Sequence, residues 1–513
     1  MTQNENHTQG HSDTNTLQAL WRHAIAAFPE KTAVVCGDHR YTYSEADHLC
    51  ASLASHLAAY GMGIDLRVAA LLPNCMEYYL LYWAIVKCAG IIVPVNPWLK
   101  SESIDAILDT VSPSLVILPD EGAPELEASL SKRPQLPRLP AAEILRLSKE
   151  PAASSPMPEA RPDDAAIIMH TSGTTAAPKG AVMRHCDLEF NAATTIYAQG
   201  FREDDVHLIV NPMFHCTALY SSLPSAVRQG ASVVITADTQ PEALLRIIQK
   251  EHITTCLTVP SILQRITHLP GISDYDLSSL RVIGYAGSFM PVKVVRELQR
   301  LFPACELHNF FGLTETISAT HLLATSDALI HPDSIGKLLP GVEAMVVDEQ
   351  LAPCPAGVVG ELLFARENVI PCYYAKPGKL EESFVTIGNK IWFRTGDLAC
   401  VDAEGFFFIK GRKKEMIIVG GENVFASEVE AVILQMDEVR EAHVQGIPAT
   451  GIRESLGEMI LAAVVPEPGC TLTADAVRRF CFKRLPSYKV PHQVRFLDAL
   501  PRNASGKIIP LKP

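Results

Sequence analysis

The sequence lacks the surplus of basic residues that a protein coating nucleic acid needs. Its 513 residues contain 44 Lys plus Arg against 57 Asp plus Glu, and the formal net charge is −13. Proteins bind the phosphate backbone of DNA or RNA largely through positive charge. We therefore exclude nucleic acid as a partner.

Cysteine patterns typical of metal sites and disulfide frameworks are also missing. The 13 cysteines are an odd number, and they are scattered from Cys36 to Cys481 without a CxxC pair. Such a distribution matches neither a zinc site nor a set of disulfides. It favours a cytoplasmic location, where thiols stay reduced.

Long hydrophobic runs and targeting signals are absent as well. No stretch approaches the roughly 20 apolar residues that cross a bilayer. The first residues, MTQNENHTQGHSDTNT, are polar and lack the basic-then-apolar order of a signal peptide. We expect no transmembrane segment and a disordered tail over residues 1–16, while peripheral membrane contact stays open.

The chain is long and apolar enough for at least two domains, since it is 48% hydrophobic. Between residues 232 and 287, apolar runs alternate with an amphipathic helical stretch, which predicts βαβ units. A hairpin is expected near residues 398–410, and EVEAVILQM (428–436) begins a new amphipathic helix. The predicted fold class is α/β: a large N-terminal domain (17–411) of mainly parallel, helix-covered sheets, and a small α+β lid domain (412–513). The proline-rich, acidic stretch 112–164 predicts long surface connections.

The strongest local signal is the segment TSGTTAAPKG (171–180), which follows the apolar run AAIIM. Small hydroxyl residues and glycine let backbone N–H groups and hydroxyls surround phosphate oxygens, and a lysine adds positive charge. The candidate phosphate-binding residues are Thr171, Ser172, Gly173, Thr174, Thr175 and Lys179. Walker spacing is not met, because Pro178 stands where that motif requires glycine. A flexible surface loop of the same composition is the alternative.

This segment resembles the phosphate-loop signature of adenylate-forming enzymes, the superfamily of acyl-CoA synthetases, luciferases and peptide-synthetase adenylation domains. Further motifs of that superfamily follow in its order: PMFH (212–215), NFFGLTET (309–316), GEL (360–362), WFRTGD (392–397), IKGRKKEMIIVGGENV (409–424) and PRNASGK (501–507). In its overall sequence the chain is similar to fatty-acyl and carnitine-type CoA ligases.

The resemblance implies an ATP- and AMP-binding site. In NFFGLTET it assigns adenine stacking to Phe311, a phosphate contact to Thr314 and a magnesium ion to Glu315, whose oxygens suit a hard cation. Relatives usually carry tyrosine in place of Phe311, so stacking should survive without a phenol contact. Core packing of both phenylalanines is the alternative. The other implied nucleotide-binding residues are Gly287, Ser288, Phe289, Asn309, Phe310, Gly312, and the ribose-binding pair Asp397 and Arg412.

Catalysis in this superfamily has two steps, and the resemblance implies that the small domain contributes different residues to each step. Lys507 would bring positive charge to the carboxylate and the α-phosphate during adenylation. The small domain, mobile about a hinge at Lys414, would then rotate so that the turn at Gly420, Gly421 and Glu422 borders a tunnel for coenzyme A. His215 would act as the gate between nucleotide and thiol; a hydrogen-bonded core histidine is the alternative.

The expected reaction joins a carboxylic acid to coenzyme A with ATP and Mg²⁺, through an acyl-AMP, and releases AMP and pyrophosphate. Amino-acid-activating relatives have an aspartate where this chain has His215, so an aliphatic or aryl acid is favoured. The chain ends six residues after Lys507, which indicates a free thiol acceptor. A separate acyl carrier protein as acceptor, a non-catalytic nucleotide- or acyl-binding protein, and a luciferase-type oxidation are the alternatives. A homodimer is compatible with the sequence, which does not determine the oligomeric state.

Overall fold

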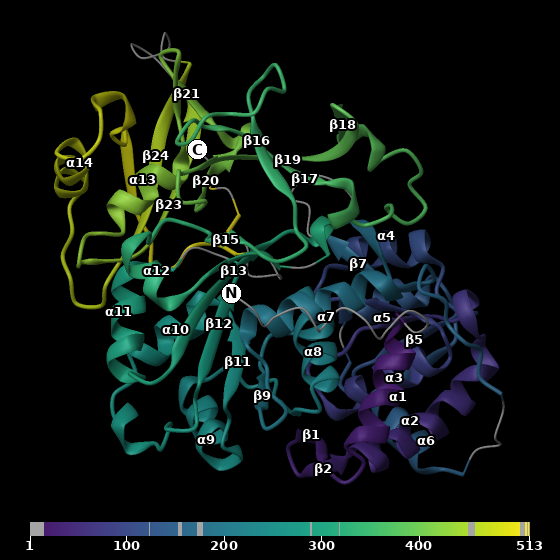
Figure 1. The fold of residues 1–513 in the computed structure, drawn as a ribbon. Helices are drawn as coiled ribbons and strands as arrows, with labels where there is room; N and C mark the ends of the chain where they lie inside the picture. Colours follow the sequence, from purple (N-terminus) through teal and green to yellow (C-terminus); the bar gives the residue numbers. More distant parts are fainter. Residues whose placement is uncertain are drawn as a thin grey trace, which may run out of the picture. The chain divides into compact units, whose positions relative to one another are not determined.

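A computed structural model describes residues 15–122, 124–151, 156–171, 178–287, 290–317, 319–449, 457–502, 508–509 and 511. The chain divides into two compact units (Figure 1). The first takes its residues from 1–288, 296–325 and 368–382, and the second from 289–295, 326–367 and 383–513. Each unit is described by itself.

One mainly parallel sheet of the first unit runs in the order β14-β13-β12-β11-β9-β10-β1-β2. Neighbours from β13 to β1 pair in parallel, whereas β2 and β14 pair antiparallel at its two sides. The strands are β1 (Thr32–Cys36), β2 (His39–Thr42), β9 (Val206–Ile209), β10 (Ser232–Ile235), β11 (Thr255–Thr258), β12 (Val282–Ala286), β13 (Glu306–Gly312) and β14 (Ala319–Leu323).

A second sheet of this unit has the order β6-β5-β3-β4-β7-β8. Its pairs are parallel except β7 with β8, which form an antiparallel hairpin. The strands are β3 (Arg67–Ala70), β4 (Ile91–Pro94), β5 (Leu115–Leu118), β6 (Arg138–Pro140), β7 (Ala165–Thr171) and β8 (Lys179–Arg184). The hairpin therefore brackets the predicted phosphate loop.

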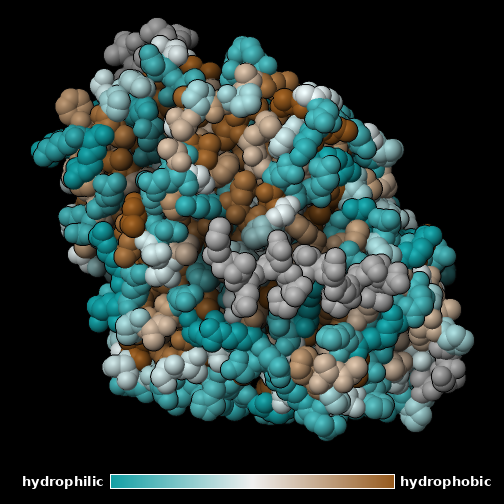
Figure 2. Space-filling model, viewed as in Figure 1, coloured by the Kyte–Doolittle hydropathy of each residue, from teal (hydrophilic) through white to brown (hydrophobic). Residues whose placement is uncertain are grey.

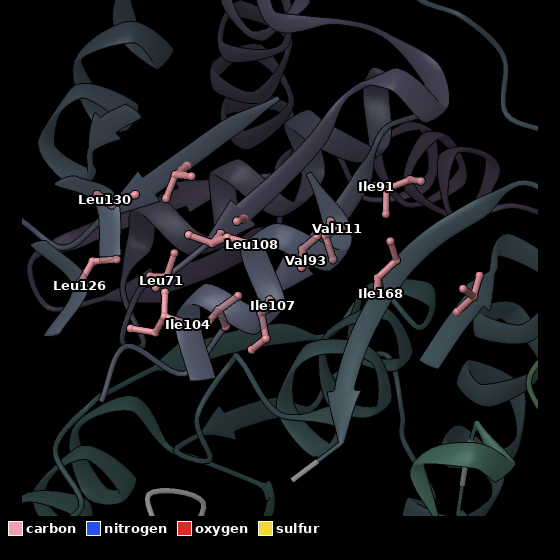
Figure 3. Packing of buried hydrophobic residues seen from close by; sticks show 14 residues of the cluster. Leu71, Ile91, Val93, Ile104, Ile107, Leu108, Val111, Leu126, Leu130 and Ile168 are labelled. Atoms are coloured by element: carbon pink, nitrogen blue, oxygen red, sulfur yellow. The ribbon is translucent and has the colours of Figure 1, made fainter. Parts of the chain in front are cut away.

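Helices connect and cover these strands. Most carry apolar residues on one side, whereas the helix Met76–Lys87 is buried on nearly all sides. They are α1 (Leu17–Ala27), α2 (Tyr43–Leu57), α3 (Met76–Lys87), α4 (Ser101–Val111), α5 (Pro124–Ser131), α6 (Ala141–Lys149), α7 (His185–Gln199), α8 (Leu223–Arg228), α9 (Pro241–Glu251), α10 (Pro260–Thr267) and α11 (Val292–Leu301). A π-helix (Thr217–Ser222) precedes α8. Figure 3 shows Ile104, Ile107 and Leu108 of α4 packed toward Val93 of β4, so α4 covers one face of the second sheet.

The second unit contains an antiparallel sheet and a small α+β part. The sheet has β16 (Ala344–Val347), β17 (Gly360–Ala365), β18 (Phe384–Ile387), β19 (Lys390–Val401) and β20 (Phe407–Arg412). After it come the hairpin β21 (Ile417–Val419) and β22 (Glu422–Val424), helices α13 (Ala426–Ile433) and α14 (Ala474–Phe482), and a sheet of β23 (Val439–Pro448), β24 (Glu458–Pro466) and β25 (Gln493–Phe496). The short elements α12 (Thr325–Ile330) and β15 (Lys337–Leu338) precede β16.

The predicted α/β class with mainly parallel, helix-covered sheets and a C-terminal α+β part is confirmed. The expected βαβ units appear as β10-α9-β11 and the strand β12, and the expected hairpin is β19-β20. The expectation of long surface connections over 112–164 was wrong, because this stretch contains β5, α5, β6 and α6. The predicted helix at 428–436 ends earlier, at Ile433, although Met436 still packs in the same cluster.

Within the part of the chain that the structure describes, no helix has the length and apolar character to cross a membrane. On the face viewed in Figure 2, hydrophilic residues cover most of the lower part of the first unit. Residues 1–14 of the predicted tail lie outside the described residues, and α1 begins at Leu17 with its N-terminus capped by the Thr16 hydroxyl.

Candidate active site

The ends of the predicted phosphate loop meet in the β7-β8 hairpin. Thr171, the last residue of β7, pairs with Lys179, the first residue of β8, and His170 pairs with Gly180. A Cβ atom at Gly180 would lie 2.7 Å from Ile168 and 3.2 Å from the His170 imidazole, so only glycine fits this pairing. The sequence signal for a glycine directly after Lys179 thus has a packing cause.

His170 lies next to the loop end of this hairpin, and its side chain has no hydrogen-bond partner among the described residues. Neither ring nitrogen is bonded within the described part of the chain. Burial, together with the positive charge of Lys376, lowers the pKa of His170 to about 4. The imidazole is therefore neutral near pH 7. Lys179 and Lys376, whose ammonium donates to the Pro178 carbonyl at 3.4 Å, are the cations near this end of the loop.

Glu315 lies in a short 3-10 turn (Thr314–Thr316) between β13 and β14. Its Oε1 accepts a hydrogen bond from the Tyr373 hydroxyl at 2.7 Å, and its carbonyl accepts one from the Ile370 amide at 2.9 Å. The next residue but one, Ile317, has a φ of +67°, an unfavourable backbone conformation for a β-branched residue. Asn191, which is buried, donates to the Ile317 carbonyl at 2.8 Å and stabilises this strained turn.

Strand β13 carries the predicted adenine-binding residues on alternating faces. Phe310 is buried, and its ring lies so close to Gly284 that a Cβ there would approach it to 2.7 Å. Phe311 points the other way and is half-buried, with the His321 ring edge-on at 5.7 Å. Asn309 is half-buried and Gly312 exposed. Phe311, rather than Phe310, is thus accessible to a base.

His215 follows Phe214 in the segment before the π-helix. Its Nδ1 lies 4.0 Å from the Cys216 sulfur, and the Phe214 and His215 rings are 6.0 Å apart. Burial alone would lower the pKa of His215, but its hydrogen bond with the Cys216 thiol raises it instead. Burial would likewise raise the pKa of Cys216, and the His215 contact lowers it. The two side chains lie in contact, and the sequence indicated only the histidine.

In the second unit, Asp397 and Arg412 face each other across β19 and β20. Arg412 Nε lies 3.1 Å from the buried Asp397 carboxylate. The GEL and WFRTGD motifs meet beside them, because Arg394 Nη2 contacts the buried Glu361 at 2.5 Å. The Gly396 amide also donates to Glu361 at 3.3 Å, so this carboxylate holds the turn that carries Asp397.

The residues predicted as hinge and tunnel, Lys414, Gly420, Gly421 and Glu422, are exposed. Lys414 lies in a 3-10 turn (Lys413–Glu415) directly after β20. Gly420 (φ +60°) and Gly421 (φ +88°) form the turn between β21 and β22, and Glu422 begins β22. Two consecutive positive φ angles explain why this turn needs two glycines.

Several predicted residues cannot be placed. Gly287 directly follows β12 in a positive φ conformation (+91°) and is exposed. The predicted residues that lie outside the described part of the chain are Ser288, Phe289, Ser172, Gly173, Thr174, Thr175 and Lys507. Sequence reasoning missed Tyr373, which contacts two predicted site residues. The tyrosine pair in CYYAKP (372–377) was its only visible signal.

The first unit thus holds a lysine at the end of the predicted phosphate loop and a carboxylate in a strained turn, and the second unit holds a paired aspartate and arginine. Residues 21–374 match the AMP-binding enzyme family, and residues 428–507 match the AMP-binding enzyme C-terminal domain. The chain belongs to the AMP-binding enzyme family. The predictions of this family and of an enzyme are confirmed, and the non-catalytic alternative is set aside.

Curated relatives and solved structures extend over nearly the whole chain. Feruloyl-CoA synthase from Amycolatopsis sp is 32% identical, over 94% of this chain and 95% of its own length. The fatty acid–[acyl-carrier-protein] ligase ScoC from Streptomyces coeruleorubidus is 31% identical, over 94% of this chain and 92% of its own. The ATP-bound MatB structure from Rhodopseudomonas palustris has a TM-score of 0.85 and 26% identity, covering 96% of this chain and 97% of MatB.

Proposed function

We propose that this enzyme is an ATP-dependent carboxylic acid:CoA ligase of the AMP-forming type. In the first step a substrate carboxylate oxygen attacks the α-phosphorus of ATP, and the bond to the β-phosphate breaks, so that acyl-AMP forms and pyrophosphate leaves. In the second step the thiol of coenzyme A loses its proton and attacks the acyl carbonyl, and AMP leaves. The observation that carries the proposal is the Glu315 turn beside Lys179 and Tyr373 in a chain that aligns end to end with CoA ligases.

The described residues fit a magnesium ion held jointly with ATP. No group of three or more His, Cys, Asp or Glu within them could hold a metal alone. Glu315 Oε1 accepts from Tyr373, while Oε2 makes no hydrogen bond or ion pair with any described residue. Mg²⁺ commonly uses one or two carboxylates together with substrate phosphates and water. Glu315 would hold the ion, which supplies positive charge to the phosphates when bound.

Nucleotide contacts are proposed for both units. Lys179 would bind the phosphates and Phe311 would stack on adenine. The buried Asp397 would accept hydrogen bonds from the ribose hydroxyls, with Arg412 fixing its orientation. Lys507, the proposed catalytic cation, lies outside the described residues. The C-terminal domain (412–513) would begin near Arg412 and rotate about Lys414, so that it could serve both steps. The turn at Gly420, Gly421 and Glu422 would border the coenzyme A tunnel.

The acid is proposed to be aliphatic or aryl. Position 215 holds His rather than the aspartate expected for an α-ammonium group, and the following π-helix buries Ala218, Leu219 and Tyr220. A relative acting on an aryl acid and one acting on a fatty acid, by their names, support both classes. The 13 free cysteines support a cytoplasmic location. A homodimer is a further proposal, which light scattering of the purified protein tests.

A carrier-protein ligase is the second candidate, because ScoC is as similar to this chain as the CoA ligase. The experiment measures AMP and pyrophosphate release from ATP and Mg²⁺ across aliphatic and aryl acids, with coenzyme A, with a purified acyl carrier protein, and with neither acceptor. Thioester formation with coenzyme A supports the first candidate. Turnover only with the carrier protein supports the second, and silence with every acid contradicts both.

A further inference from the structure

Tyr373 connects the two charged groups of the first unit's site. It is 6% exposed, and its hydroxyl donates to Glu315 Oε1 at 2.7 Å. The Lys179 ammonium lies over the face of the same ring, 4.9 Å from its centroid. One side chain thus contacts an anion through its edge and a cation through its face.

The backbone around Tyr373 is attached to the same two elements. The Ile370 amide donates to the Glu315 carbonyl at 2.9 Å, and the Tyr374 amide donates to the Gly180 carbonyl at 2.7 Å. The Val182 amide donates to the Cys372 carbonyl at 3.1 Å. Segment 370–374 therefore ties the Glu315 turn to strand β8, which begins with Lys179, and the position of Tyr373 is determined from both sides.

These contacts keep opposite charges apart. Lys179 and Glu315 both approach Tyr373, yet they form no ion pair with each other among the described residues. A direct pair would neutralise both groups, whereas a cation over an aromatic face keeps its full charge. The Tyr373 hydroxyl is the donor in its hydrogen bond to the Glu315 carboxylate, which can only accept.

We propose that Tyr373 is a positioning residue: its hydroxyl orients the Glu315 carboxylate, and its ring holds Lys179 away from Glu315 so that both charges face ATP. This inference rests on the proposed function. A hydrogen bond from a neutral donor to a charged acceptor is among the stronger ones in proteins, so its loss should be measurable in the adenylation step.

The test compares Tyr373→Phe and Tyr373→Leu with the matched control Tyr374→Phe. Among the described residues the Tyr374 hydroxyl contacts neither Glu315 nor Lys179, and the variant retains the backbone bond to Gly180. Tyr373→Phe removes only the hydroxyl. It should slow single-turnover acyl-AMP formation about 10- to 100-fold and raise the Mg²⁺ concentration for half-maximal rate, while metal-free ATP binding by calorimetry stays within about twofold of wild type. Tyr373→Leu also removes the ring and should weaken metal-free ATP binding several-fold, since Lys179 can then pair with Glu315.

A double-mutant cycle with Glu315→Gln separates positioning from a general structural role. If Tyr373 acts through Glu315, Tyr373→Phe should add little to the rate loss that Glu315→Gln causes by itself. If Tyr373→Phe instead slows the enzyme by damaging the fold independently of Glu315, the rate losses of the two single variants should multiply in the double variant. The cycle stays decisive even when Tyr373→Phe lowers thermal stability. Multiplicative effects, or rates and ATP affinities equal to those of Tyr374→Phe, overturn the inference. A wild-type enzyme that forms no acyl-AMP overturns the proposed function instead, and the metal-free ATP affinities still test the ring contact.

Discussion

Replacing Glu361 by glutamine removes the charge that holds the turn before Asp397. Glu361 is 7% exposed. Its Oε2 accepts from Arg394 Nη2 at 2.5 Å and from Nε at 3.2 Å, and its Oε1 accepts from the Gly396 amide at 3.3 Å. Glutamine keeps the shape and one acceptor, but its amide nitrogen would face a guanidinium that can only donate.

The expected cost follows from the exposure of the two partners. Hydrogen bonds to charged groups contribute about 1.5–3 kcal/mol and neutral ones about 0.5–1.5 kcal/mol. The Arg394 side chain is 40% exposed and stays solvated after the change, so the loss should remain below the roughly 3–5 kcal/mol of stripping a fully buried pair. We expect the second unit to lose about 1–2 kcal/mol and the affinity for AMP to fall by about tenfold, because the Asp397 turn loses its support.

The assay compares urea midpoints and AMP dissociation constants of Glu361→Gln with those of Glu343→Gln. Glu343 carries the same substitution in the same unit, but its pair with Lys390 (2.6 Å) has both side chains about half exposed, and exposed pairs contribute little. The control should behave like wild type in both measurements. Equal losses in the two variants, or an unchanged Glu361→Gln protein, would refute the argument from burial.

Three further outcomes are expected. Burial lowers the pKa of His207 to about 3, so the unfolded chain binds a proton at His207 more tightly than the folded protein does. The contribution of the neutral imidazole to the free energy of unfolding is therefore fully present above about pH 6.5. It is lost as the pH falls toward 3, by up to about 1.4 kcal/mol per pH unit. His207→Gln should flatten the fall of the urea midpoint between about pH 7 and 5, and an unchanged slope contradicts this. Lys507→Ala should slow acyl-AMP formation about 10²- to 10³-fold while sparing thioester formation from supplied acyl-AMP; equal loss of both steps would sink the two-orientation model. Gly421→Ala places a side chain at φ +88°, which costs about 1–2 kcal/mol, and should raise the KM for coenzyme A without changing ATP–pyrophosphate exchange; a parallel drop in exchange argues against the tunnel.

The family, the fold class and the order of the motifs were readable from the chain because each depends on local patterns. Strand and helix periodicity in residues 232–287 follows from which side chains must be buried, and it predicted β10, α9 and β11 without tertiary information. The stretch 112–164 misled the same reasoning. Its prolines and acidic residues resemble loop composition, yet Leu126, Leu130 and Ile144 are buried and hold short helices against neighbouring elements.

The sequence by itself determined which chemical groups are available. They are the hydroxyl and glycine residues before Lys179, the Glu315 carboxylate, and Asp397 and Arg412, whose separation in the chain allows them to pair across a hairpin. Only the tertiary structure decided which of these groups touch. Tyr373 reaches Glu315 across 58 residues of chain, and Phe310 and Phe311 take opposite faces of one strand. Residue types and spacing follow from local physics, whereas contacts between distant segments arise only when the sheets pack and their side chains compete for the same space.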